Sequence, residues 1–338
     1  MEPAVHLLLG MELCGRFSRD ACNPRNGTVT YDIEPVTSVE RLRAFARQAP
    51  GIRGARAALA TIDRIVENAW SPMEALLAAL IVLPGDEFGY DLWPITLNPR
   101  KEASENLLPY VSASSRVPDI LFNATSIGLN YDGEDHFGLR RIAQAAMKAA
   151  AEPGNAQLGQ EVEDAIASAR LRIVGDKRRD RDLETQGYTV LPVTKEDFSE
   201  NGGVDRVIAQ VIEAIEREGA RQLDAQRQLL QNKELAEARQ LFIWSLLPGL
   251  AAHEARRKLQ ELEEARALAE AAEHGEPADP GKPAGAGNPA EQAQAVEQTE
   301  REEAANPTES ADAMRHAMNT LAIEYLASHR YRALVGAA

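Results

Sequence analysis

Residues 71–84 carry the clearest helix pattern in the first half of the chain. An almost uninterrupted apolar run at residues 75–83 follows Ser71 and Pro72, and Glu74 stands three residues after the serine. Serine before a proline, with glutamate at the third helical position, is typical of a helix N-terminus. Pro84 then predicts its end. Because this helix is apolar on almost every side, we expect it to be buried.

Three short apolar runs downstream have the length and composition of β-strands. Residues 119–122 and 127–131 follow a turn at Pro118 and are joined by four small or polar residues, a pattern that predicts a β-hairpin. Residues 188–193 predict a further strand. Helical patterns at residues 139–151, 157–174 and 176–186 lie between the hairpin and this strand. The alternation predicts an α/β fold.

The rest of the chain divides by composition. Residues 1–69 predict a small mixed α/β region, and residues 70–215 predict the α/β core with a helical insertion at residues 138–175. Residues 216–274 predict long helices, and their apolar strip at residues 241–247 is expected to pack on the core or on a partner chain. Residues 275–309 predict a disordered acidic linker, and residues 310–338 predict a last helix.

The net charge of −15 argues against nucleic-acid binding, because basic side chains supply most of the non-specific affinity for phosphates. Its distribution weakens that argument. Residues 261–310 contain 13 acidic and 3 basic residues, whereas residues 116–195 contain 12 and 11. The second segment includes a basic cluster that could contact DNA, formed by Lys177, Arg178, Arg179 and Arg181. Aspartates alternate with these residues, so a solvated, ion-paired helix face is the alternative interpretation.

No segment has the pattern of a secretory leader or a membrane span. The apolar run near Met1 is short, and the longest apolar stretch, residues 241–252, is interrupted by Pro248. Cys14 and Cys22 match neither a zinc site nor a disulfide framework. We therefore expect a cytoplasmic protein without membrane contacts.

Polar side chains gather where the predicted hairpin opens. Asn130 and Asp132 lie two residues apart on one predicted strand and so share a face. Asp119 begins the paired strand at the same end, and His136 follows the turn after Asp132. Oxygen ligands fixed on a sheet suit a hard cation such as Mg²⁺ or Mn²⁺, which activates water and neutralises a phosphate. A histidine beside them can act as a general base.

These residues, taken in order, resemble a known family. The order consists of Ser71-x-x-Glu74, Pro118-Asp119, Tyr131-Asp132-Gly133-x-x-His136 and Asp176-x-x-Arg179. It resembles the Vsr-like branch of the restriction-endonuclease-like superfamily, which includes very-short-patch-repair-type nucleases and bacterial proteins similar to AbiEi-type abortive-infection proteins. The resemblance covers residues 52–198. It implies a central mixed sheet flanked by helices and a metal-dependent DNA endonuclease in bacterial defence or on a mobile element.

The resemblance also implies a role for each residue of the site. Glu74 is the outer ligand of a Mg²⁺ or Mn²⁺ ion, Asp119 is the principal ligand, and Asn130 stands where family members usually have glutamate. Asp132 is an auxiliary acid and His136 is a proton carrier. Because a neutral amide supplies only one carbonyl oxygen, Asn130 is expected to lower the affinity for the metal.

Several functions remain open at this point. An active nuclease and a degenerate one both agree with the pattern, and so does a non-catalytic module that binds nucleic acid or protein with a nuclease-derived fold. A third class is a structural protein that forms a homodimer, or binds a partner protein, through its C-terminal helices.

Each residue of the predicted site also has an ordinary explanation. Glu74 can complete a capping box, Asp119 and Asp132 can be turn residues, and His136 can be a surface histidine. The hypothesis depends on their joint order rather than on any one of them.

Overall fold

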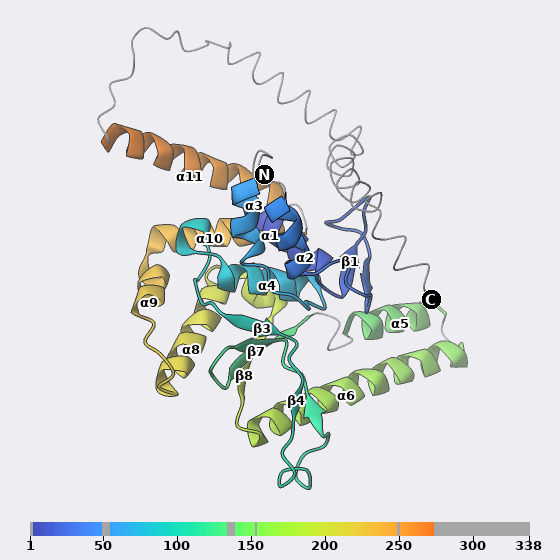
Figure 1. Cartoon of the computed structure of the whole chain (residues 1–338). Coiled ribbons are helices and arrows are strands. Elements are labelled where there is room, and N and C mark those ends of the chain that lie inside the picture. Colours follow the sequence, from blue (N-terminus) through green and yellow to red (C-terminus); the bar gives the residue numbers. More distant parts are fainter. Residues whose placement is uncertain (1–2, 49–54, 134–138, 153, 249–250, 274–338) are drawn as a thin grey trace, which may run out of the picture. The chain divides into compact units, whose positions relative to one another are not determined.

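The computed structural model describes residues 3–48, 55–133, 139–152, 154–248 and 251–273 (Figure 1). Described residues 3–20 and 28–266 belong to one compact unit. The first elements of the chain are α1 (Pro3–Leu13), β1 (Phe17–Arg19), β2 (Val29–Tyr31), α2 (Val39–Gln48) and α3 (Ala55–Ile62). Leu7 and Met11 of α1 are buried in the same hydrophobic core as the residues of α4 (Pro72–Val82).

Helix α4 lies where the sequence predicts it. The Ser71 hydroxyl oxygen accepts a hydrogen bond of 3.2 Å from the Glu74 N–H, and Pro72 is the first helical residue. All residues from 74 to 82 are buried. Leu83 is extended and ends the helix before the 3₁₀ turn η1 (Gly85–Glu87). The prediction of a buried helix is therefore confirmed.

A four-stranded mixed sheet lies beside α4 (Figure 1). Its strands, in spatial order, are β3 (Ile95–Leu97), β6 (Ile120–Phe122), β7 (Ile127–Asp132) and β8 (Thr189–Thr194). The pairs β3–β6 and β6–β7 are antiparallel, with Ile120 opposite Leu129, and β7–β8 is parallel. The predicted hairpin and the third strand are confirmed, and the fold is of the mixed α/β class.

The sheet has one apolar face and one partly polar face. The apolar face packs with α4 and with α8 (Gly203–Arg217), and it contains Ile95, Leu97, Ile120, Phe122, Ile127 and Leu129. Because residues two apart on a strand share a face, Asn130 and Asp132 of β7 belong to the opposite face. The C-terminal part of α6 (Ala156–Thr185) contacts β8 and β5 (Ser115–Arg116).

The connection from β7 to β8 is helical, as predicted, but its helices differ from the prediction. Helix α5 (Leu139–Ala151) packs on α6, and α6 runs as one helix through Gly175, where the sequence predicted a boundary. An internal glycine costs about 1 kcal/mol, which the packing of a long helix can offset. The two-stranded sheet formed by β4 (Lys101–Glu102) and β5 was not predicted, because two-residue strands have no periodicity to detect.

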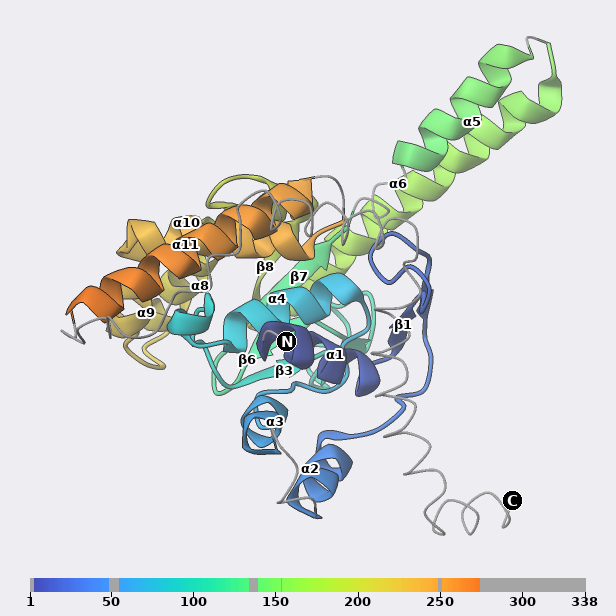
Figure 2. The same ribbon diagram turned by 90° about the horizontal axis from the view of Figure 1, so that it is seen from above.

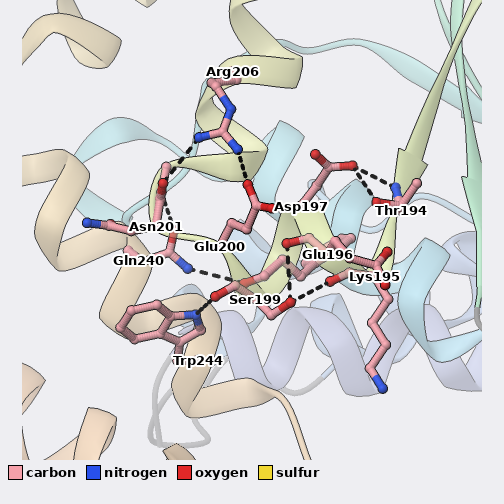
Figure 3. A network of polar contacts seen from close by, with 12 residues as sticks. Thr194, Lys195, Glu196, Asp197, Ser199, Glu200, Asn201, Arg206, Gln240 and Trp244 are labelled. Carbon is pink, nitrogen blue, oxygen red and sulfur yellow. Dashed lines mark hydrogen bonds and ion pairs between the residues drawn. The ribbon is translucent and has the colours of Figure 1, made fainter.

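The chain continues after β8 as a series of helices. These are α7 (Lys195–Ser199), α8, α9 (Asp224–Gln231), α10 (Lys233–Leu246) and α11 (Ala251–Glu273). Side-chain hydrogen bonds connect α10 to α7 (Figure 3): the Trp244 ring N–H donates to the Ser199 carbonyl at 3.2 Å. The Gln240 side-chain amide donates to the Phe198 carbonyl at 3.2 Å.

The apolar strip at residues 241–247 is largely covered within the chain. Phe242 and Ile243 are each 1% exposed and belong to the main core. The expectation that this strip is buried is confirmed, and its partner is the core of the same chain. None of the described helices is long and apolar enough to cross a membrane. The predicted linker at residues 275–309 and the predicted helix at residues 310–338 lie outside the described residues.

Candidate acidic site at the end of the hairpin

Asp119 and Asn130 close the open end of the β6–β7 hairpin. Asp119 directly precedes β6, and its N–H donates to Asn130 Oδ1 at 3.1 Å. Asp119 Oδ2 accepts a hydrogen bond of 2.6 Å from the Tyr131 N–H. Both side chains therefore extend the ladder of hydrogen bonds beyond the last backbone pair. The expected closeness of Asp119 to Asn130 is present in the structure.

Glu74 reaches the same place from the N-terminal turn of α4. Its Oε2 accepts hydrogen bonds of 2.9 Å from the Trp70 N–H and from Asn98 Nδ2. The bond to Trp70 resembles a capping-box contact, so the ordinary explanation for Glu74 accounts for part of its surroundings.

Asn98 connects the two acidic residues and was not identified from the sequence. Its N–H donates to the Asp119 carbonyl at 2.9 Å, while its side chain donates to Glu74 and to the Asn68 carbonyl. Its backbone has a left-handed φ of 48°, which asparagine adopts more readily than most residues. Asn98 stands just after β3, a three-residue strand that the sequence analysis did not predict, so no signal in the sequence marked this residue.

Burial and mutual repulsion change the protonation of this acidic pair. The pKa of Asp119 is raised to about 7, first by burial and then by the charge of Glu74, against the opposing effects of the Tyr131 N–H and Arg179. Burial also raises the pKa of Glu74, although hydrogen bonds from Asn98, Trp70 and Ser71 act in the other direction. Two carboxyl groups held together in this way favour either a bound proton or a bound cation.

Asp132 faces the site from β7 and is paired with Arg179 of α6. Arg179 Nη2 lies 3.7 Å from Asp132 Oδ1, and both side chains are about one-fifth exposed. The charges of Asp132 and Arg179 both act on the Asp119 carboxyl. The three acidic residues implied by the resemblance are thus close enough to interact electrostatically.

The basic cluster predicted on α6 is divided by the structure. Lys177, Arg178 and Arg181 are exposed, and Lys177 Nζ lies 4.0 Å from Asp180 Oδ2. Arg179 instead faces the acidic site. Helical spacing explains the division, because residue 179 shares a face with the buried Asp182 and Leu183.

The oxygen atoms at this site fit a single hard cation better than a histidine- or cysteine-rich metal centre. Among the described residues, no three His, Cys, Asp or Glu side chains are grouped closely enough to hold a metal ion. Two carboxylates and the amide oxygens of Asn98 and Asn130 are nevertheless available, and Mg²⁺ accepts such oxygen ligands. Asn98 Oδ1 is buried and has no hydrogen-bond partner among the described residues. His136 lies outside the described residues.

Asp182 anchors the end of α6 that carries Arg179. Its carboxylate accepts hydrogen bonds from the Ser112 N–H at 2.9 Å, the Ser112 hydroxyl at 2.7 Å and Arg116 Nε at 2.8 Å. Burial acts to raise the pKa of Asp182, but these donors outweigh it and hold the value at about 2. The residue 103–114 loop and α6 are therefore joined by a charged contact.

We expect Asp182→Ala to lower the free energy of unfolding at pH 7 by about 1–3 kcal/mol, because the donors of Ser112 and Arg116 lose their buried, charged acceptor. The pKa of Asp182 is depressed in the folded state, so its contribution is present above about pH 4 and is lost as the pH falls toward 2. Urea unfolding at several pH values measures this difference. Asp180→Ala, on the exposed side of α6, is the control and should change stability little. A penalty at Asp182 that does not decline below pH 4 would contradict the assignment.

No family model matches the chain, and neither the search of curated proteins nor the search of solved structures finds a similar protein. The function of the chain must therefore be inferred from its own residues.

Proposed function

We propose that the chain is a metal-dependent DNA endonuclease whose acidic site is formed by Glu74, Asp119 and Asp132. One observation carries the proposal. Asn98 donates from its side chain to Glu74 Oε2 and from its N–H to the Asp119 carbonyl, and the two carboxyl groups lie so close that the charge of Glu74 raises the pKa of Asp119. Repulsion between two carboxylates destabilises the fold, but two negative charges held close together are what a divalent cation requires. Carboxyl groups whose pKa values are shifted by burial and by a neighbouring charge are typical of functional sites.

The arrangement of elements supports a restriction-endonuclease-like fold for the core. Helix α4, strands β3, β6 and β7, helix α6 and strand β8 follow one another, and the strands form a mixed sheet. A central mixed sheet flanked by helices is what the resemblance to the Vsr-like branch implies. Glu74, Asp119 and Asp132 occupy one helix start, one strand start and one strand end in that order.

Glu74 and Asp119 would hold a Mg²⁺ or Mn²⁺ ion, with an amide oxygen of Asn98 or Asn130 as a further ligand. The ion would activate water and neutralise charge on the phosphate. Asp119 must lose its proton before it binds a cation, so metal affinity should rise as the pH increases through about 7. Arg179 is placed to donate hydrogen bonds to a phosphate oxygen, and Asp132 orients its guanidinium group.

The exposed basic residues of α6 would contact the DNA backbone. Lys177, Arg178 and Arg181 lie on the same helix as Arg179 and are solvent-exposed. Lysine and arginine at such positions bind phosphates and make affinity depend on salt. The proposed DNA path therefore runs along the C-terminal half of α6 toward the acidic site.

A non-catalytic module with a nuclease-derived fold is the second candidate. It is favoured by Asn130, because the Oδ1 atom of this side chain already accepts a hydrogen bond from the Asp119 N–H. Asn130 is also only 3% exposed. On this account the asparagine stabilises the hairpin end, and the protein binds nucleic acid or protein without cleaving it.

Cleavage of supercoiled plasmid DNA distinguishes the two candidates. The nuclease should convert the plasmid to nicked or linear forms in Mg²⁺ or Mn²⁺, and a chelator should stop the reaction. Plasmid that is bound but remains intact with both metals would favour the non-catalytic module.

The substitution Asn130→Glu gives a second test, because it places a carboxylate beside Asp119. We expect a crossed response, in which the variant is less stable than the natural protein in chelator but gains more stability from Mn²⁺. The first effect comes from repulsion among carboxylates and the second from stronger binding of an anionic oxygen. Thermal unfolding of both proteins in chelator and in Mn²⁺ measures it. Asn130→Gln is the control for size, and equal destabilisation of the glutamate variant with and without metal would assign Asn130 to the hairpin alone.

A further inference from the structure

Helix α6 presents a regular stripe of residues on the side that faces away from α5. Ala165 and Ala169 of α6 are buried, and α5 packs along this part of the helix (Figure 2). Because each residue turns the helix by about 100°, Ala167 and Leu171 point to the other side. The residues on that side alternate at spacings of four and three: Gln160, Asp164, Ala167, Leu171, Val174 and Arg178. We refer to these six residues as the outer stripe.

The outer stripe exposes large apolar side chains on a helix face that would be polar if it only contacted water. Leu171 is 73% exposed and Val174 is 38% exposed. The α5–α6 hairpin carries five of the fourteen exposed large hydrophobic side chains in the described part of the chain: Met147, Ile166, Leu171, Ile173 and Val174. Spacings of four and three are those by which one helix packs along another. The stripe therefore has the pattern of a helix–helix interface.

The charges on α6 are arranged so that two copies complement each other. Residues 156–165 contain Glu161, Glu163 and Asp164 and no basic residue. Residues 170–178 contain one acidic residue, Asp176, and four basic ones: Arg170, Arg172, Lys177 and Arg178. If a second α6 runs antiparallel about the midpoint of the stripe, residue 164 lies opposite residue 174 of the other copy. Asp164 is then one helical turn from Arg170 and Arg178 of that copy. Two-fold symmetry repeats the contact.

We propose that a second copy of this chain binds antiparallel along the outer stripe of α6 and forms a homodimer. Leu171 of each copy packs against Ala167 of the other at the centre, Val174 flanks this contact, and the acidic and basic segments pair on either side. Because the outer stripe faces away from α5, the two α6 helices then lie side by side between the two α5 helices.

The homodimer does not depend on the proposed nuclease activity, but it takes Arg178 from the proposed DNA contacts and leaves Lys177 and Arg181 to them. It also differs from the dimer through C-terminal helices that the sequence suggested. The most apolar part of those helices is occupied, because Phe242 and Ile243 are buried in the core of their own chain. DNA is a poor occupant for the whole stripe, since Asp164 would face phosphates and Leu171 would remain exposed.

Charge reversal in the full-length chain tests the proposal without removing any apolar contact. The first variant carries E163K and D164K, and the second carries R170E and R178E. Each variant alone should dissociate, because like charges then meet at both ends of the interface. An equimolar mixture should form a heterodimer, because the reversed segment of one variant faces the reversed segment of the other. Sedimentation equilibrium gives the dissociation constant in each case.

We expect each variant to weaken self-association by at least about 10-fold and the mixture to recover most of it. The exposed pair on α11 provides a matched control, R257E with E261R, which should associate like the natural chain. Circular dichroism checks that every variant is folded. The proposal would be overturned if the natural chain is monomeric at a concentration of about 100 μM, at which even a weak dimer is partly formed. A dimer that neither variant weakens would place the interface elsewhere and would overturn it equally.

Discussion

Asp119→Asn is expected to abolish metal-dependent DNA cleavage while making the protein more stable in the absence of metal. The asparagine keeps an oxygen that can accept the Tyr131 N–H, so the hairpin end is preserved. It removes the principal metal ligand, and we expect activity to fall by at least about 100-fold, since loss of groups that merely support a ligand lowers activity 10- to 100-fold.

The gain in stability should depend on pH. The pKa of Asp119 is raised from 3.8 to about 7, so between these values the folded chain holds a proton that the unfolded chain has lost. The natural protein should therefore lose stability as the pH rises through this range and stay level above it. The variant lacks this slope and should exceed the natural protein at pH 8 in chelator by up to about 4 kcal/mol. Urea unfolding at pH 5, 6, 7 and 8 measures both curves.

Asp91→Asn is the control for this experiment, because Asp91 is exposed and its removal should leave the slope unchanged. If Asp119→Asn is as active as the natural chain, the site is assigned wrongly. If the variant loses activity but has the same pH slope as the natural protein, Asp119 is not the residue that titrates near pH 7.

Arg239→Ala should produce the largest loss of stability in the described part of the chain, about 3–5 kcal/mol. Arg239 is 0% exposed, and its Nη1 donates to Asp205 Oδ1 at 2.8 Å. Its Nε donates to the Phe88 carbonyl at 3.2 Å, and its guanidinium carbon lies 4.5 Å from the centre of the Tyr90 ring. The Tyr90 hydroxyl donates to the same Asp205 oxygen at 2.5 Å. Removing the arginine leaves a carboxylate and a phenol without their cation.

Two comparisons identify the cause of that loss. Arg257→Ala, in an exposed ion pair on α11, should cost less than about 1 kcal/mol. The double variant R239M with D205N should recover part of the loss, because the second substitution leaves a neutral amide that can still accept the Tyr90 hydroxyl. Denaturant unfolding measures all three, and a cost below about 1 kcal/mol for Arg239→Ala would show that the buried pair contributes little.

Local signals in the sequence were enough to predict most of the core elements. Ser71, Pro72 and Glu74 mark the start of α4, and the apolar runs around Pro118 correspond to β6 and β7. Each of these signals lies within a few residues of the element that it predicts. The boundary expected at Gly175 was wrong because tertiary contacts of α6 outweigh the low helix propensity of one glycine.

The candidate site could be predicted only in part, because its contacts join residues far apart in the sequence. Strand pairing alone brings Asp119 to Asn130, whereas the closeness of Glu74 was implied by the family resemblance. Asn98 has no periodic pattern around it, and its role depends on how β3 ends beside α4. The Arg239–Asp205 pair joins positions 34 residues apart, and no local pattern marks either residue as buried.

Binding of Mn²⁺ to the natural protein at two pH values tests the central claim most directly. If Glu74 and Asp119 form a cation site, saturating Mn²⁺ should raise the melting temperature at pH 8, and the increase should be smaller at pH 6, where Asp119 holds a proton. The same addition should leave the melting temperature of Asp119→Asn unchanged at both values. An unchanged melting temperature of the natural protein in Mn²⁺ at pH 8, or an equal increase in the variant, would contradict the assignment of a metal site to these residues.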